Sequence, residues 1–107
     1  MGGNNDADPQ ARVAAFRERH EMDAPLPYAI LDLQSEVGEL AKEVTTSTEY
    51  GDEPANAVVA EDELGDAFFS LLSVAEAADI DADQALDAAL DKYEDRIETT
   101  GDAGSGE

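Results

Sequence analysis

Apolar residues recur at intervals of three and four along most of the chain, which is the spacing of one face of an α-helix. The longest series consists of Leu26, Ile30, Leu33, Val37, Leu40 and Val44. A second series consists of Leu64, Phe68, Leu71, Ala75 and Ala78. The sequence contains no alternating pattern typical of β-strands, so it predicts an all-α fold that resembles a four-helix bundle.

Capping residues and prolines predict where the helices begin. Asp8 before Pro9 is typical of a helix N-cap followed by proline at the first helical position. Pro54 predicts the start of another helix, and Asp81 with Gln84 resembles a capping box. The four predicted helices span approximately residues 8–21, 27–46, 53–78 and 81–99. We interpret residues 8–99 as one domain, with disordered ends at 1–7 and 100–107.

Gly38 and His20 each allow one prediction about how the helices pack. Gly38 lies inside the second predicted helix, where glycine costs about 1 kcal/mol relative to alanine. We hypothesise that it permits a close approach of two helices, with Gly65 as its counterpart in the third helix. His20 is the only histidine, and we interpret it as a partly buried structural residue.

The charge balance is strongly acidic. The chain has 27 Asp and Glu residues against 6 Lys and Arg residues, for a net charge of −21. At molar salt the Debye length is about 3 Å, so the self-repulsion of such a surface is largely screened. We therefore interpret the composition as halophile-type.

The same composition excludes several classes of function. Without a basic patch, binding to a nucleic-acid polymer is not expected. There is no cysteine, which excludes disulfides and zinc–thiolate sites. No apolar run is long enough to span a membrane and no signal-peptide pattern is present, so we expect a cytoplasmic protein with no membrane partner.

Two pairs of carboxylates stand out against this acidic background. Glu36 and Glu39 form one pair, and Glu63 and Asp66 form the other. A spacing of three places both side chains of a pair on one helix face, about 5–6 Å apart at Cβ. If the two helices are antiparallel neighbours, four carboxylates converge and require a cation. Oxygen ligands of this kind favour Mg²⁺, with Mn²⁺ as an alternative.

A basic pair in the last predicted helix complements the carboxylates. Lys92 and Arg96 are four residues apart and share a helix face, where both could contact phosphate oxygens. Together the two features indicate a site for a magnesium-bound polyphosphate. The alternative is that the acidic faces are only solvated and that Lys92 and Arg96 form ion pairs with neighbouring carboxylates.

The chain resembles the MazG-type nucleotide pyrophosphohydrolases, which belong to the all-α NTP pyrophosphatase superfamily. The resemblance rests on the Glu36-Val37-Gly38-Glu39-Leu40 stretch, the downstream Glu63-Leu64-Gly65-Asp66 and the Ile80-Asp81 start of the last helix. It runs from about residue 28 to residue 97. It implies that Glu36, Glu39, Glu63 and Asp66 bind metal and that Lys92 and Arg96 bind substrate phosphates.

The resemblance also implies an activity and an assembly. The activity is Mg²⁺-dependent hydrolysis of nucleoside triphosphates to monophosphate and pyrophosphate, in a homodimer or homotetramer. Glu39 or Glu43 would orient or deprotonate the attacking water, and removal of damaged nucleotides is the implied purpose. Two alternatives stay open: a phosphoribosyl-ATP pyrophosphohydrolase, and a non-catalytic acidic helical bundle that binds cations or a partner protein.

Overall fold

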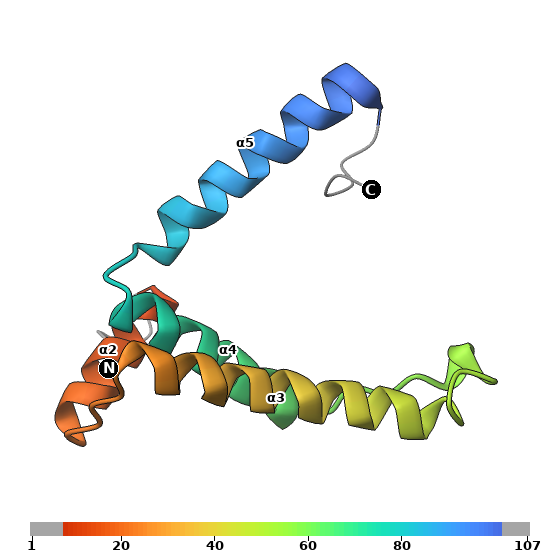
Figure 1. Cartoon of the computed structure of the whole chain (residues 1–107), viewed down its shortest axis with the longest axis horizontal. Helices are drawn as coiled ribbons and strands as arrows, with labels where there is room; N and C mark the ends of the chain where they lie inside the picture. Colours follow the sequence, from red (N-terminus) through yellow and green to blue (C-terminus); the bar gives the residue numbers. More distant parts are fainter. Residues whose placement is uncertain (1–7, 102–107) are drawn as a thin grey trace.

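The computed structural model describes residues 8–101, and it is all-helical as predicted (Figure 1). Its elements are the α-helices α2 (Pro9–Arg19), α3 (Leu26–Ser47), α4 (Glu61–Ala77) and α5 (Ala82–Thr100), and the short 3₁₀ helix η1 (Pro54–Asn56). Within the described residues there is no β-strand, and no helix is long and apolar enough to cross a membrane. The ends predicted to be disordered, 1–7 and 100–107, lie outside the described residues, except for Thr100, which is the last residue of α5, and Gly101.

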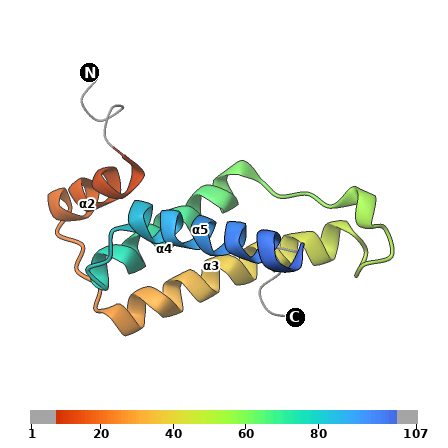
Figure 2. The same ribbon diagram turned by 90° about the horizontal axis from the view of Figure 1, so that it is seen from above.

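The centre of the fold is an antiparallel hairpin of α3 and α4, against which α2 packs (Figures 1 and 2). The buried apolar side chains of the described residues are few and mostly small: Val13, Ala29, Ala67 and Leu72. Ser70 and Ser73 on α4 are also buried, and Ser73 accepts a hydrogen bond from Arg17 of α2 at 3.3 Å. Small residues on the contact surfaces therefore hold the three helices together.

The two apolar series, which the periodicity predicts to be buried in a bundle, are only partly covered within one chain. Leu33, Leu40 and Val44 of α3 are half-buried, whereas other members of the two series are exposed. Val37 of α3 is 49% exposed, and Leu64, Phe68 and Leu71 of α4 are 48–56% exposed. The buried face of α4 carries Ala67 and Ser70 instead. Because these small side chains occupy the contact with α3, the larger apolar residues on the adjacent faces remain accessible to solvent.

The hypotheses about Gly38 and His20 are wrong within one chain. A Cβ atom added at Gly38 or at Gly65 would meet no atom within 4 Å, so neither position requires glycine for close helix approach. The side chain of His20 is exposed rather than partly buried, and its ring lies 4.6 Å from that of Phe16.

The start of the third predicted helix is wrong, because α4 begins at Glu61 rather than near Pro54. Residues 57–60 have no helical structure and are held in place by side chains of α3. The N–H of Val58 donates to Ser47 Oγ at 3.0 Å, and the N–H of Ala60 donates to Glu43 Oε1 at 2.9 Å. The hydrogen bonds from α3 and the β-branched Val58 both favour this non-helical path.

The last helix, α5, lies apart from the other three (Figure 1). None of its residues is buried, so the predicted bundle is not closed within one chain. Gln10 of α2 fixes the turn that leads into it. The Gln10 side-chain amide donates to the carbonyl of Ile80 at 2.8 Å and to Glu76 at 2.7 Å, and it accepts from the N–H of Ala82 at 2.6 Å.

Replacement of Gln10 by alanine should lower the free energy of unfolding by about 1 kcal/mol, because three hydrogen bonds at the α4–α5 turn are lost and partly replaced by water. Urea denaturation followed by circular dichroism at fixed salt measures the change. Gln34→Ala is the matched control, since Gln34 is exposed on α3. Equal midpoints for the two variants would contradict the assigned role of Gln10.

Candidate metal centre

Three carboxylates meet where α3 and α4 run side by side. One oxygen each of Glu36, Glu63 and Asp66 lies within 4.8 Å of the other two. Glu36 comes from α3, and the other two come from successive turns of α4. The burial of Ala67 and Ser70 beside Asp66 fixes which face of α4 turns toward α3. The hairpin therefore brings together carboxylates that are far apart in the sequence.

The fourth predicted ligand, Glu39, lies one turn further along α3 and is outside this close group. It borders a surface hollow of about 360 Å³ together with Glu43 and Glu63. A second hollow of about 260 Å³ is lined by Glu36 and Asp66. The three clustered carboxylates thus stand between two open depressions, both accessible to a small molecule.

Asp32 also lines the second hollow, next to Glu36 and Asp66. Asp32 belongs to neither of the two carboxylate pairs predicted from the sequence. Asp32 precedes Glu36 by four residues, which places both side chains on the same face of α3. This spacing is the feature of the sequence that could have identified Asp32. Asp32 therefore adds a further carboxylate to the acidic surface around the cluster.

Negative charge accumulates at Glu63, although Lys42 lines the same hollow as Glu39, Glu43 and Glu63. The pKa of Glu63 is raised above the ordinary value of 4.5, first by loss of hydration and then by the neighbouring charges of Asp62, Glu39, Asp66 and Glu43. Repulsion of this kind is relieved either by protonation or by a bound cation. The all-oxygen donor set fits a hard divalent cation such as Mg²⁺ or Mn²⁺.

Glu43 has a structural contact that the sequence did not reveal. Its carboxylate accepts the N–H of Ala60, the residue immediately before α4, at 2.9 Å. Glu43 therefore satisfies a backbone donor at the start of the helix that carries Glu63, in place of a local capping side chain. This contact ties the position of Glu63 to α3.

The predicted phosphate-binding residues are not part of the cluster within one chain. Lys92 and Arg96 lie on α5, which projects away from the α3–α4 hairpin (Figure 1). Both flank Tyr93, with Lys92 Nζ 5.2 Å and Arg96 Cζ 5.9 Å from the centre of its ring. Their predicted function would require the acidic cluster of another copy of the chain.

This chain is all-helical, and acidic turns of two antiparallel helices face each other. It therefore belongs to the class of helical proteins whose carboxylates can hold a divalent cation. The model of the MazG nucleotide pyrophosphohydrolase domain matches residues 28–100, and the chain belongs to this family. The matched region includes α4, α5 and all but the first two residues of α3, and therefore all of the acidic and basic residues of the candidate site. No curated protein and no solved structure gave a significant match.

Replacement of Glu63 by glutamine should raise the melting temperature at pH 7 in the absence of divalent cations. Because folding raises the pKa of Glu63, its ionisation opposes folding once the pH rises through the folded-state pKa. The stabilisation should therefore vanish below about pH 4.5, where the group is protonated in both states. Thermal melts in EDTA across this pH range, at fixed ionic strength, measure the effect.

Glu61→Gln serves as the control for this experiment, because Glu61 is exposed in the first turn of the same helix. Addition of Mg²⁺ should raise the melting temperature of the unmodified chain more than that of Glu63→Gln. Equal behaviour of the two variants in EDTA and in Mg²⁺ would contradict the role of Glu63 at the centre of the repulsion.

Replacement of Glu43 by alanine should lower the free energy of unfolding by about 1–2 kcal/mol, since the N–H of Ala60 loses its acceptor. Glu43→Gln retains a carbonyl oxygen at the same place and should recover much of the loss. Comparison of the denaturation midpoints of the two variants distinguishes the contribution of the hydrogen bond to stability from that of the negative charge. If alanine and glutamine were equally harmless, the contact would have no role in stability.

Proposed function

We propose that this protein hydrolyses nucleoside triphosphates to nucleoside monophosphate and pyrophosphate in a Mg²⁺-dependent reaction. The proposal is supported by membership of the MazG nucleotide pyrophosphohydrolase family. The observation that carries it is the convergence of Glu36, Glu63 and Asp66 within 4.8 Å across the α3–α4 hairpin. Removal of damaged nucleotides in the cytoplasm is the purpose that we infer for this activity.

In this proposal Glu36, Glu39, Glu63 and Asp66 hold the metal. When bound, Mg²⁺ polarises the phosphate and lowers the pKa of the attacking water. The oxygen of the water forms a bond to one phosphorus of the α–β bridge, the bond from that phosphorus to the bridging oxygen breaks, and the products are the nucleoside monophosphate and pyrophosphate. One proton of the water passes to a carboxylate. We assign that carboxylate to Glu39 rather than Glu43, because Glu43 already accepts the N–H of Ala60.

We further propose that the active form is a homodimer or homotetramer. The exposed apolar residues of α3 and α4 and the unburied α5 support this assembly. In such an assembly Lys92 and Arg96 of one copy would bind the substrate phosphates at the acidic cluster of another, with arginine as a planar fork and lysine as a point charge. A basic pair beside four carboxylates would offset the charge of the triphosphate.

Glu39→Gln and Asp66→Asn should each lower the rate of pyrophosphate release by about 100-fold or more, because each removes an ionised oxygen from the metal-binding or water-orienting set. The assay follows pyrophosphate from a panel of nucleoside triphosphates in molar KCl with Mg²⁺. Glu61→Gln is the control, and circular dichroism checks that the variants remain helical.

Unchanged turnover in both variants would exclude this mechanism. The same panel includes phosphoribosyl-ATP, and exclusive turnover of that compound would assign the chain to the related pyrophosphohydrolase of histidine synthesis. Absence of turnover with every compound, with Mg²⁺ and with Mn²⁺, would favour a non-catalytic cation-binding bundle.

A further inference from the structure

The helix α5 carries an apolar stripe that is largely exposed among the described residues. Leu86, Leu90 and Ile97 are 54%, 51% and 48% exposed, and Tyr93 lies on the same side of the helix. Their spacings of four, three and four are those of a helix face that contacts another element. In proteins most of the stability of a helix comes from packing of its amphipathic face, so we expect this stripe to contact another surface.

Charges are segregated on the two sides of this stripe. Projected at 100° per residue, the acidic side chains of α5 lie along one edge and the polar back: Asp83, Asp87, Asp91, Glu94, Asp95 and Glu98. Lys92 and Arg96 lie along the other edge. A surface that accepts α5 should therefore be apolar along its floor and basic along one side.

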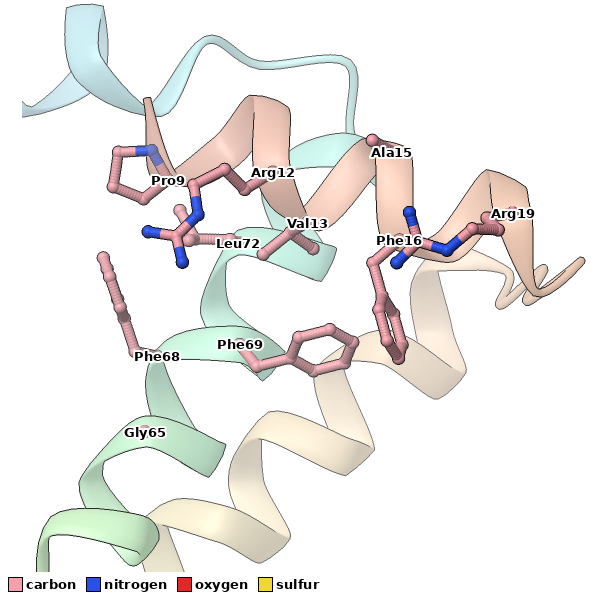
Figure 3. Close-up of a pocket in the computed structure, with 10 residues that line it drawn as sticks. All are labelled: Pro9, Arg12, Val13, Ala15, Phe16, Arg19, Gly65, Phe68, Phe69 and Leu72. Atoms are coloured by element: carbon pink, nitrogen blue, oxygen red, sulfur yellow. The ribbon is translucent and has the colours of Figure 1, made fainter. Parts of the chain in front are cut away.

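A groove between α2 and α4 has this combination (Figure 3). Its volume is about 410 Å³, and its apolar lining includes Phe16, Phe68 and Phe69. Arg12 and Arg19 of α2 lie along its α2 side, as Figure 3 shows. In a chain with only 6 Lys and Arg residues, two arginines beside one apolar groove form a marked local concentration of positive charge.

We propose that this groove binds the α5 helix of a second copy of the chain. The apolar stripe of α5 would lie on the aromatic side chains of α4 and α2, and its acidic edge would face Arg12 and Arg19. Charge complementarity supports the pairing: α2 carries three arginines and one glutamate, whereas α5 carries six acidic residues and two basic ones. The proposal specifies one contact of the assembly and does not depend on catalysis.

The turn before α5 explains why the occupant is another molecule. Gln10 holds this turn through the carbonyl of Ile80 and the N–H of Ala82, and Asp79 adopts a positive φ of 59°. These contacts direct α5 away from α4 and α2 of its own chain. A return of α5 to its own groove would break both Gln10 hydrogen bonds, whereas a second copy can be bound with the turn intact.

The absence of cysteine makes a direct test possible. Two single variants are prepared: Ala15→Cys, at an exposed position of α2 that lines the groove, and Glu94→Cys, at the acidic edge of the α5 stripe, which the proposal turns toward α2. The variants are mixed and treated with a short bismaleimide. A crosslinked heterodimer should form at about tenfold higher yield than with Asp95→Cys, which lies on the opposite, polar side of α5.

Two substitutions test the basis of the contact. Leu90→Asp should reduce crosslinking by about tenfold or more, because it places a charge in the apolar stripe. Arg19→Glu should also reduce crosslinking, measured at the lowest salt at which the unmodified chain is folded, because exposed charges are screened at molar salt. Circular dichroism confirms that both variants are folded, since Leu90 and Arg19 are exposed within one chain.

Three results would overturn the proposal. One is equal crosslinking through Glu94→Cys and Asp95→Cys. Another is crosslinking within single molecules of the double variant Ala15→Cys/Glu94→Cys at nanomolar concentration, which would place α5 in its own groove. The third is a monomer in sedimentation velocity at every protein concentration tested. The first two results can occur with pyrophosphate release intact, so failure of this contact is distinguishable from failure of the proposed function. A monomer that still releases pyrophosphate would overturn both this contact and the proposed assembly, but not the proposed reaction.

Discussion

The side-by-side packing of α3 and α4 is the constraint on which the rest of the structure depends. It places carboxylates of both helices within 4.8 Å of one another, an arrangement that repulsion between like charges opposes. Burial of Ala67, Ser70 and Leu72 helps to hold the helices in place despite this repulsion. A bound divalent cation would turn the same proximity from a cost into a stabilising interaction.

The segment that connects α3 to α4 also determines the geometry of the carboxylate cluster. Glu43 and Ser47 of α3 bind the backbone just before α4 through the N–H groups of Ala60 and Val58. The first turn of α4 carries Glu63, so these hydrogen bonds set where that carboxylate lies relative to α3. Side chains of the first acidic helix thereby determine the position of the second, and the polar loop between them can vary without moving the site.

Local patterns in the sequence predicted the helices and the acidic pairs, because periodicity, capping residues and carboxylate spacing are properties of neighbouring residues. The late start of α4 escaped prediction, since it depends on contacts of Glu43 and Ser47 with residues 11 to 17 positions away. The exposure of Val37, Leu64 and Phe68 was also not predicted from the sequence. A hydrophobic stripe indicates that a helix face becomes buried, but not whether the covering surface belongs to the same molecule.

The scarcity of buried apolar side chains has a thermodynamic consequence. Val13, Ala29, Ala67 and Leu72 are the buried hydrophobic residues in the described part of the chain. Unfolding of a single molecule would therefore expose little additional apolar area, and the heat-capacity increment of unfolding should be small for a chain of this length. A small increment flattens the dependence of stability on temperature, so the stability of the isolated protomer would vary little with temperature and the protomer would resist cold denaturation.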